Sequence, residues 1–298
     1  MSKRGNFTLA RREKQIKAFL ELSKPGVLFM VLVTAGMGFY LGASGWSDWS
    51  RLLWTLLGTA LAAGGSLALN QYLERDLDAC MRRTRSRPLP AGRLQPREAL
   101  VFGLVTMLGG LLVLACLVNG LSALVTAVTA MSYLFLYTPL KRRTPFCSIV
   151  GAIPGALPPV TGWVAARGEL SIEAGVLFAI LFLWQMPHAL AIAWLYREDY
   201  ARAGIRVLPV ANPDAVITVR QVVSNCVALF PVALFPTLIG LTGVVYFFAM
   251  FFLGVIFLGC GIDLARSCSP KAARRLVKVS FIYLPIQLAL MAFDRLIF

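Results

Sequence analysis

Long apolar runs divide the chain, and short polar segments separate them. Each run has at least about 18 residues, so as a helix rising about 1.5 Å per residue it nearly crosses the ~30 Å hydrocarbon core of a bilayer. The pattern predicts an all-α polytopic membrane protein, with nine transmembrane helices in a bundle around a central cavity that opens to the cytosolic side. The predicted spans are residues 25–44, 52–73, 98–117, 121–138, 148–166, 173–195, 219–241, 243–262 and 277–297.

Composition and charge also indicate that lipid, and not water, surrounds most of the protein. Of the 298 residues, 58% are apolar and 14% charged, which is more apolar surface than a soluble domain of this size could bury. The net charge of +15 would suit nucleic acid, but the basic residues lie in the short polar segments, so no nucleic-acid partner is expected. If residues 1–24 are cytosolic, the 29 Lys and Arg all lie inside except Arg51, Arg167 and Arg295. This predicts an inner-membrane protein with a cytosolic N-terminus and a periplasmic C-terminus.

The predicted organisation is a single intramembrane domain, residues 1–298. It begins with a basic cytosolic segment, 1–24, and two longer cytosolic loops, 74–97 and 196–218, carry most of the polar chemistry. The six cysteines have no paired spacing, so we interpret them as free thiols rather than a zinc site. Prolines in the fifth and sixth spans remove backbone donors that lipid cannot replace, so the bends there should face protein or water.

The inner end of the second span carries an acidic stripe. At about 100° per residue, Asn70, Glu74 and Asp78 share one face of a helix. Carboxylates at a membrane-embedded helix end are costly unless they are paired or bind a cation, and oxygen ligands of this kind suit Mg²⁺. An arginine-rich loop follows, so metal and arginines together describe a diphosphate site. The alternative is that the acids simply pair with these arginines at the headgroups.

The fourth span ends in a second group, Tyr137 followed by Lys141 and Arg142. A lysine there can bind phosphate as a point charge, although a basic flank is also typical of any cytosolic span end.

The sixth span carries Trp184 and His188 and runs on toward Asp199. In an unbroken helix Asp199 would lie within about 20° of the His188 face and about 16 Å nearer the cytosol, so the two would share one cavity. His188 is the only histidine, which excludes bis-histidine haem ligation within one subunit. An ionisable side chain at membrane depth favours a functional role, against the alternative of a satisfied hydrogen-bonding group.

Three motifs combine these residues. They are Asn70-x-x-x-Glu74-Arg75-Asp76-x-Asp78 with Met81-x-Arg83-Thr84-x-x-Arg87-Pro88-Leu89, Tyr137-Thr138-x-x-Lys141-Arg142, and Trp184-Gln185-Met186-Pro187-His188 with Asp199-Tyr200 and Val207-Leu208-Pro209-Val210. From Lys24-Pro25 to the last span, the chain resembles the protohaem IX farnesyltransferase (haem O synthase) family of the UbiA-type intramembrane prenyltransferase superfamily. It departs at Glu74, where the superfamily generally has Asp, and at Glu198-Asp199, a reduced form of a second aspartate-rich motif.

The resemblance implies that farnesyl diphosphate donates its chain to the vinyl group of haem b, giving haem O for terminal oxidase assembly. It implies Mg²⁺ on Asn70, Glu74 and Asp78, with Lys141 and Asp199 also catalytic. The substrate-binding residues that it implies are Arg83, Arg87, Tyr137, Arg142, Trp184 and His188. His188 could orient haem, ligate its iron or manage a water molecule, and the sequence does not choose among these roles. Membrane lipid is an expected partner, and association with haem A synthase or a terminal oxidase is left open.

Three other functions remain open from the sequence. A prenyltransferase with an aromatic or quinone-precursor acceptor would share the diphosphate chemistry and differ near the sixth span. A non-catalytic haem-handling protein would release no diphosphate. A transporter is disfavoured, because the candidate acids and bases gather at the cytosolic side rather than along a path across the membrane.

Overall fold

The computed structural model describes residues 13–43, 48–212 and 214–297, so residues 1–12 of the predicted basic segment lie outside it. In this described part the chain is all-α, and nine helical segments are long and apolar enough to cross a membrane. The fold class and the nine spans are therefore confirmed, whereas the central cavity open to the cytosol stays a prediction. The helices of the spans are α2 (Pro25–Gly42), α3 (Trp49–Leu73) with α4 (Arg75–Cys80), α5 (Pro96–Leu117), α6 (Gly120–Met131) with η2 (Ser132–Tyr137) and α7 (Thr138–Leu140), α8 (Cys147–Ala156) with α9 (Pro158–Arg167), α10 (Ile172–Leu195), α13 (Val216–Leu238), α14 (Val244–Ser267) and α15 (Pro270–Ile297).

The outer surface of the bundle is apolar. Large side chains such as Val105 and Leu112 on α5 and Phe252 on α14 are exposed. A water-soluble protein of this size would not expose so much contiguous apolar surface, but lipid solvates it without cost. The chain is a multi-pass membrane protein.

Span five is broken at its prolines, whereas span six is continuous. α8 ends at Ala156 and α9 begins at Pro158, because a proline ring has no N–H to donate to the preceding turn. Pro187 lies inside α10 without ending it. As expected, these prolines face protein: the buried ones are Pro154, Pro158, Pro159 and Pro187.

Two glycines bring α2 and α9 together backbone to backbone. A Cβ atom on Gly38 would lie 1.9 Å from the carbonyl oxygen of Pro159, and one on Gly162 would lie 1.8 Å from that of Ala35. Small residues of this kind let membrane helices approach closely, where packing rather than a hydrophobic driving force holds them. The contact fixes the position of the first span, whose helix α2 begins directly after Lys24.

Span four contains a π-helix near its C-terminal end, which the sequence did not predict. η2 interrupts the α-helical winding between α6 and α7, and Thr138 Oγ1 donates to the carbonyl oxygen of Tyr133 at 2.9 Å. Pro139 follows directly and cannot donate the next helical hydrogen bond. Single π-helical turns are rare in proteins overall, but those that occur are often found at functional sites.

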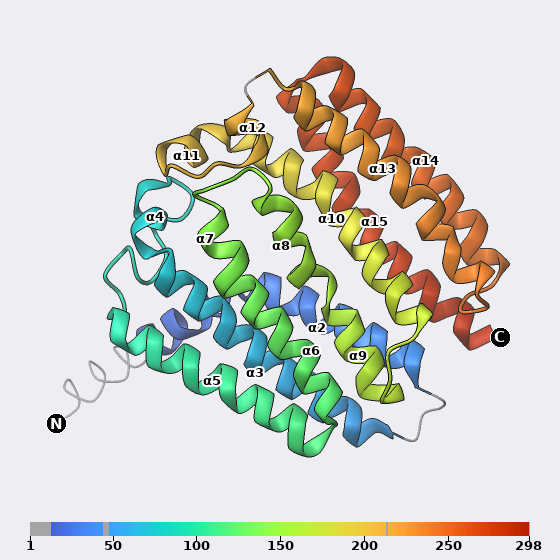
Figure 1. Cartoon of the computed structure of the whole chain (residues 1–298), viewed down its shortest axis with the longest axis horizontal. Helices are drawn as coiled ribbons and strands as arrows, with labels where there is room; N and C mark the ends of the chain where they lie inside the picture. Colours follow the sequence, from blue (N-terminus) through green and yellow to red (C-terminus); the bar gives the residue numbers. More distant parts are fainter. Residues whose placement is uncertain (1–12, 44–47, 213, 298) are drawn as a thin grey trace, which may run out of the picture.

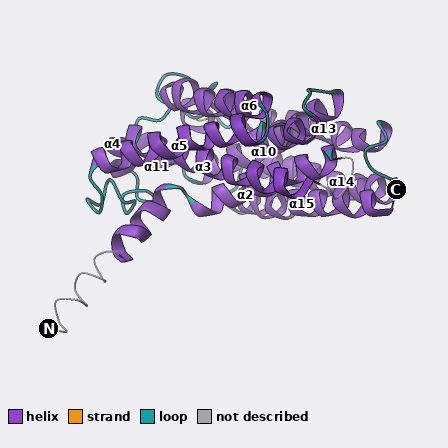
Figure 2. Ribbon diagram, turned by 90° about the horizontal axis from the view of Figure 1, so that it is seen from below, coloured by secondary structure: helices purple, strands orange, loops and turns teal. Residues whose placement is uncertain are grey.

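The ends of spans two, four and six that the sequence predicts to be cytosolic meet. Figure 1 shows α4 together with the short helices α11 (Arg197–Arg202) and α12 (Leu208–Ala211) at one end of the bundle, and Figure 2 places α4 and α11 at that same end. Met81, directly after α4, packs against Ala203 and Ile205. The amide of Arg206 donates to the carbonyl oxygen of Lys141 at 2.8 Å. Side chains from distant parts of the chain therefore converge here.

Candidate active site

The acidic stripe predicted from the sequence forms at the C-terminal end of span two. The amide of Glu74 donates to Asn70 O at 2.9 Å and that of Asp78 to Glu74 O at 2.8 Å, so the helical register continues across the junction of α3 and α4. All three side chains are buried, whereas that of Asp76 is 88% exposed. The stripe therefore faces protein and Asp76 faces away from it.

Each member of the stripe is bound by a cationic side chain. Lys141 Nζ lies 2.8 Å from Glu74 Oε1, and Arg87 Nη1 lies 2.7 Å from Asp78 Oδ2. Lys24 Nζ donates to Asn70 Oδ1 at 2.9 Å. Within the described part of the chain, Lys24, Arg87 and Lys141 thus set three basic side chains against the two carboxylates, an arrangement that is complementary to a diphosphate.

Lys24, which directly precedes the first span, has a shifted pKa. Burial, together with the nearby charges of Arg87 and Lys141, lowers the pKa of Lys24 to about 7. An anion placed among these three cations would favour the charged form of Lys24 again. The cluster is therefore arranged to gain from a bound anion.

The π-helix η2 and the residue after it also contribute side chains to this cluster. The hydroxyl of Tyr133 donates to Asn70 Oδ1 at 3.0 Å, and Asn70 Nδ2 donates to Thr138 Oγ1 at 3.1 Å. The ammonium of Lys141 lies 4.3 Å from the ring centroid of Tyr137, a cation–π contact. Asn70 thus links α3, η2 and Lys24.

The stripe fits Mg²⁺ in the chemistry of its oxygen donors but is not a closed metal cage. Among the described residues, no three His, Cys, Asp or Glu side chains are grouped to hold a metal ion. Asn70 Oδ1 already accepts two hydrogen bonds, and both carboxylates are paired with cations. Proteins commonly bind Mg²⁺ through one or two carboxylates together with substrate phosphates, and the stripe suits that arrangement.

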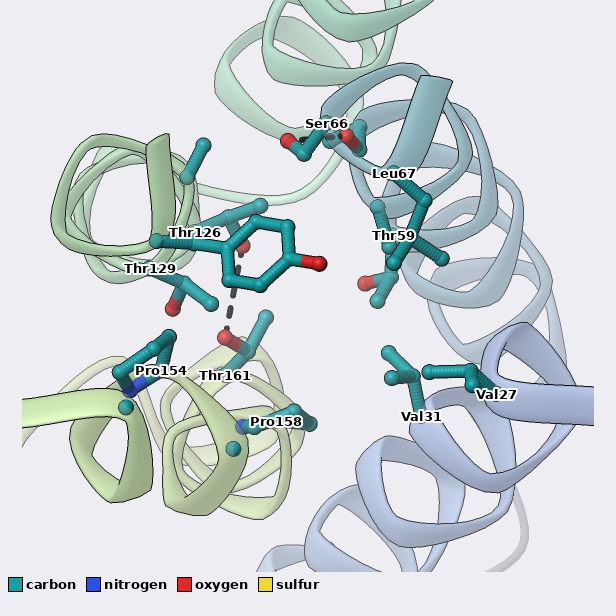
Figure 3. Close-up of a pocket in the computed structure, with 16 residues that line it drawn as sticks. Val27, Val31, Thr59, Ser66, Leu67, Thr126, Thr129, Pro154, Pro158 and Thr161 are labelled. Carbon is teal, nitrogen blue, oxygen red and sulfur yellow. Dashed lines mark hydrogen bonds between the residues drawn. The ribbon is translucent and has the colours of Figure 1, made fainter. Parts of the chain in front are cut away.

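An apolar cavity adjoins the cluster through Tyr133, which belongs to the lining of the cavity and bonds to Asn70. Figure 3 shows side chains of α2, α3, α6, α8 and α9 around it. Its hydroxyl groups mostly bond within the protein: Thr126 lies 3.4 Å from Thr161, and Ser66 and Thr129 donate to backbone carbonyls. The wall therefore presents an apolar surface to a ligand.

The sixth span is divided at one residue, Tyr196. α10 ends at Leu195 and α11 begins at Arg197, while the amides of Tyr196 and Tyr200 donate to Ile192 O and Tyr196 O at 3.0 and 3.1 Å, as at the junction of α3 and α4. Glu198 and Asp199 lie in the first turn of α11, where the helix dipole favours acidic side chains and a new helix start. Asp199 pairs with Arg202 in its own helix rather than with the stripe.

Of the remaining candidates, Arg83 and Arg142 lie in the loops, and Trp184 and His188 lie in the sixth span. The guanidinium of Arg83 lies 5.7 Å from the ring centroid of Tyr196, and Arg142 is exposed. Trp184 and His188 lie between α10 and α15, where both contact Ser280. Hydrogen bonds, ion pairs and ring contacts thus join Asn70, Glu74, Asp78, Arg87, Tyr137 and Lys141. Among the described residues, no such contact joins Asp199, Arg83, Arg142, Trp184 or His188 to this group.

Comparison with known proteins identifies the fold that carries this cluster. Residues 31–284 match the model of the UbiA prenyltransferase family. The chain belongs to the UbiA prenyltransferase family.

A UbiA relative from Solibacter usitatus, named protoheme IX farnesyltransferase, is 48% identical over 289 residues, which cover 94% of this chain and 99% of the relative. The UbiA fold is shared with a solved structure of digeranylgeranylglyceryl phosphate synthase, at a TM-score of 0.80 and 16% identity, covering 94% of this chain and 98% of that one. A UbiA homologue from Archaeoglobus fulgidus bound to GPP and Mg²⁺ has a TM-score of 0.64 at 16% identity, covering 92% and 99%. At that identity the two structures support the fold alone.

Three residues of this UbiA cluster were not among the site residues predicted from the sequence. Tyr133 and Thr138 form hydrogen bonds with Asn70 because of the π-helix, and no hydrophobic periodicity in the sequence predicts that π-helix. Lys24 lies before the segment that matches the family model. Its sequence signal is slight: a lysine directly before a proline that begins an apolar helix. Its positive φ of 47° is unusual for a residue other than glycine and marks the sharp entry into α2.

Proposed function

We propose that this chain transfers the farnesyl group of farnesyl diphosphate to a vinyl group of haem b, giving haem O. The observation that carries the proposal is the cationic cluster of Lys24, Arg87 and Lys141 on a buried carboxylate stripe, beside an apolar cavity. That arrangement suits a substrate with a diphosphate head and a hydrocarbon tail. The name of the Solibacter relative, protoheme IX farnesyltransferase, supports the choice of haem as acceptor.

The head of the substrate would bind at the cluster. Lys24, Arg87 and Lys141 would turn from their present partners to the diphosphate and take up the charge that grows as its C–O bond breaks. Asn70, Glu74 and Asp78 would hold Mg²⁺ together with oxygens of the diphosphate. When bound, Mg²⁺ supplies positive charge beside the leaving group.

The tail would lie in the apolar cavity, which excludes water from the allylic cation. The ring of Tyr133 lines the cavity, and that of Tyr137 lies 5.8 Å away, so their π-faces can stabilise the cation as it forms. A vinyl carbon of haem then attacks C1 of the farnesyl group, and the positive charge moves to the porphyrin side. One water adds there and loses a proton, so haem b, farnesyl diphosphate and water give haem O and diphosphate. A haem A synthase or a terminal oxidase would receive this product.

Mass spectrometry of the haem extracted after incubation with farnesyl diphosphate and Mg²⁺ tests the proposal. We expect haem b to gain the mass of one farnesyl group and one hydroxyl group, with equimolar release of diphosphate. Parallel incubation with 4-hydroxybenzoate tests the alternative acceptor class. If haem stays unmodified and 4-hydroxybenzoate is prenylated, the acceptor is an aromatic acid and not haem. If no diphosphate is released with either acceptor, the chain is not a prenyltransferase.

Lys24→Gln should weaken binding of farnesyl diphosphate about tenfold to 100-fold, because a charge-assisted hydrogen bond is worth about 1.5–3 kcal/mol. The measurement is the KM for farnesyl diphosphate. Lys17→Gln, an exposed lysine of the preceding helical segment, is the matched control and should leave KM unchanged. Equal KM values for the two variants would remove Lys24 from the diphosphate site.

The proposed orientation puts the polypeptide in the inner membrane with the cluster on the cytosolic side. Cys268, between α14 and α15, and Glu169, between α9 and α10, are both exposed and fall on opposite sides in this topology. In a variant that keeps Cys268 and replaces the other cysteines by serine, an impermeant maleimide should label Cys268 only after the membrane is permeabilised. A Glu169→Cys variant lacking all native cysteines should be labelled in intact spheroplasts. The reverse pattern would invert the topology.

A further inference from the structure

A group of side chains between α10 and α15 is not used by the diphosphate chemistry. His188 and Trp184 are four residues apart on α10, so they share one face, and their rings stack at 5.2 Å with an interplanar angle of 14°. Phe281 of α15 meets the imidazole edge to face at 4.9 Å. The two aromatic neighbours fix the rotation of the imidazole ring.

Ser280 holds both members of this pair. Its carbonyl oxygen accepts from Trp184 Nε1 at 3.1 Å, and its hydroxyl oxygen lies 2.6 Å from His188 Nδ1. The same hydroxyl donates to the carbonyl oxygen of Val277 at 2.7 Å. A serine hydroxyl has a single proton, and a carbonyl can only accept. The proton of Ser280 therefore goes to Val277, and both hydrogen bonds form together only if His188 Nδ1 is the donor to Ser280.

This network determines the tautomer of His188. A neutral imidazole protonated at Nδ1 carries its lone pair at Nε2. The neutral form is favoured because the ring is packed among aromatic side chains at membrane depth, and no acidic side chain among the described residues is paired with it. Nε2 makes no hydrogen bond within the described part of the chain. It is thus a nitrogen ligand with no partner.

The face of α10 that bears His188 is only partly covered. Trp184, Gln185 and His188 are half-buried and Ala189 is exposed, whereas Met186, Pro187 and Leu190 on the other side are buried. Gln185 donates to the carbonyl oxygen of Ala152 on α8, and His188 faces α15. The same α8 contributes Gly151 and Pro154 to the apolar cavity. Gln185, three residues before His188 on α10, therefore contacts the helix that lines the apolar cavity, whereas His188 itself contacts α15.

We infer that His188 binds the haem substrate through its iron, using Nε2, and that Ser280 is a positioning residue that holds the imidazole in the Nδ1–H tautomer. Histidines that bind metals typically donate their other ring N–H to a fixed acceptor, and Ser280 provides that acceptor here. Iron ligation would hold the macrocycle from one atom while leaving its vinyl groups free to reach the farnesyl cation. This inference rests on the proposed function in taking haem as the acceptor.

The test is spectroscopic titration of the purified full-length protein with haem b, without farnesyl diphosphate or Mg²⁺. The wild type should show the absorption and iron–histidine stretching bands of a histidine-ligated haem. His188→Ala should lose them, and added imidazole should restore them. An unchanged spectrum in His188→Ala, or a wild type without histidine ligation, would overturn the inference.

Ser280 is tested separately. Ser280→Ala should bind haem about 10- to 100-fold more weakly, with a shifted iron–histidine stretch, because Nδ1–H loses its acceptor. Ser280→Thr keeps a hydroxyl and should restore both. An unshifted stretch in Ser280→Ala would remove its positioning role. Because these readouts need no turnover, a protein that ligates haem through His188 but transfers no farnesyl would refute the proposed function alone, and transfer without ligation would refute this inference alone.

Discussion

Asp78→Asn is expected to abolish farnesyl transfer, lowering the rate at least about 100-fold. Asp78 is 1% exposed and accepts from Arg87 through both carboxylate oxygens, at 2.8 and 2.7 Å. The asparagine has nearly the same volume but no charge, so it can neither orient Arg87 nor bind a divalent ion as strongly. The measurement is the initial rate of haem O formation by mass spectrometry.

The matched control lies two residues away on the same helix. The side chain of Asp76 is 88% exposed, so Asp76→Asn removes the same charge outside the cluster and should leave the rate within about twofold. Loss of Asp78 also leaves a partly buried arginine without its partner, which can destabilise the fold. The double variant with Arg87→Gln removes that arginine and should remain folded and inactive. Full activity in Asp78→Asn would refute a catalytic role for the stripe.

Gly162→Ala should prevent accumulation of the folded protein. The added Cβ atom would lie 1.8 Å from the carbonyl oxygen of Ala35 and 2.6 Å from the amide nitrogen of Phe39. Both are backbone atoms, so no side-chain rotation can relieve the overlap, and α2 would have to move away from α9. Overpacking of this kind costs about 1–3 kcal/mol or more. The yield of monodisperse protein in detergent and its thermal unfolding midpoint measure the effect.

Gly109→Ala on α5 controls for the substitution itself. No other atom would lie within 4 Å of its Cβ, and alanine favours a helix over glycine by about 1 kcal/mol. Yield and midpoint should therefore equal or exceed those of the wild type. A Gly162→Ala variant as stable as Gly109→Ala would mean that the two backbones are not in contact in the folded protein.

The membrane spans were predictable because their signal is local. About 20 consecutive apolar residues have few alternatives to a transmembrane helix, and the nine predicted runs match the nine helical segments of the described chain. The stripe of Asn70, Glu74 and Asp78 was predictable for a similar reason, since the α-helical period continues through the junction at Glu74.

What could not be predicted depends on breaks in that period and on contacts between distant segments. The π-helix η2 is such a break, and extrapolation of a regular helix fails there. Lys24 and Asn70 are 46 positions apart, so only the packing of α2 against its neighbours brings them together. The acceptor of His188, Ser280, lies 92 positions away on α15. Such pairings are properties of the bundle rather than of any one helix.

The π-helix η2 limits how span four can be exchanged between proteins. A π-helical turn holds one residue more than an α-helical turn, so a segment of the same length wound entirely as an α-helix would turn one end relative to the other by about 100°. Tyr133 and Lys141 would then point to different sides of the segment. A chimera designed by matching span lengths alone would insert normally into the membrane yet present its lysine at the wrong azimuth, so grafts of this segment should be aligned on the tyrosine and the lysine together.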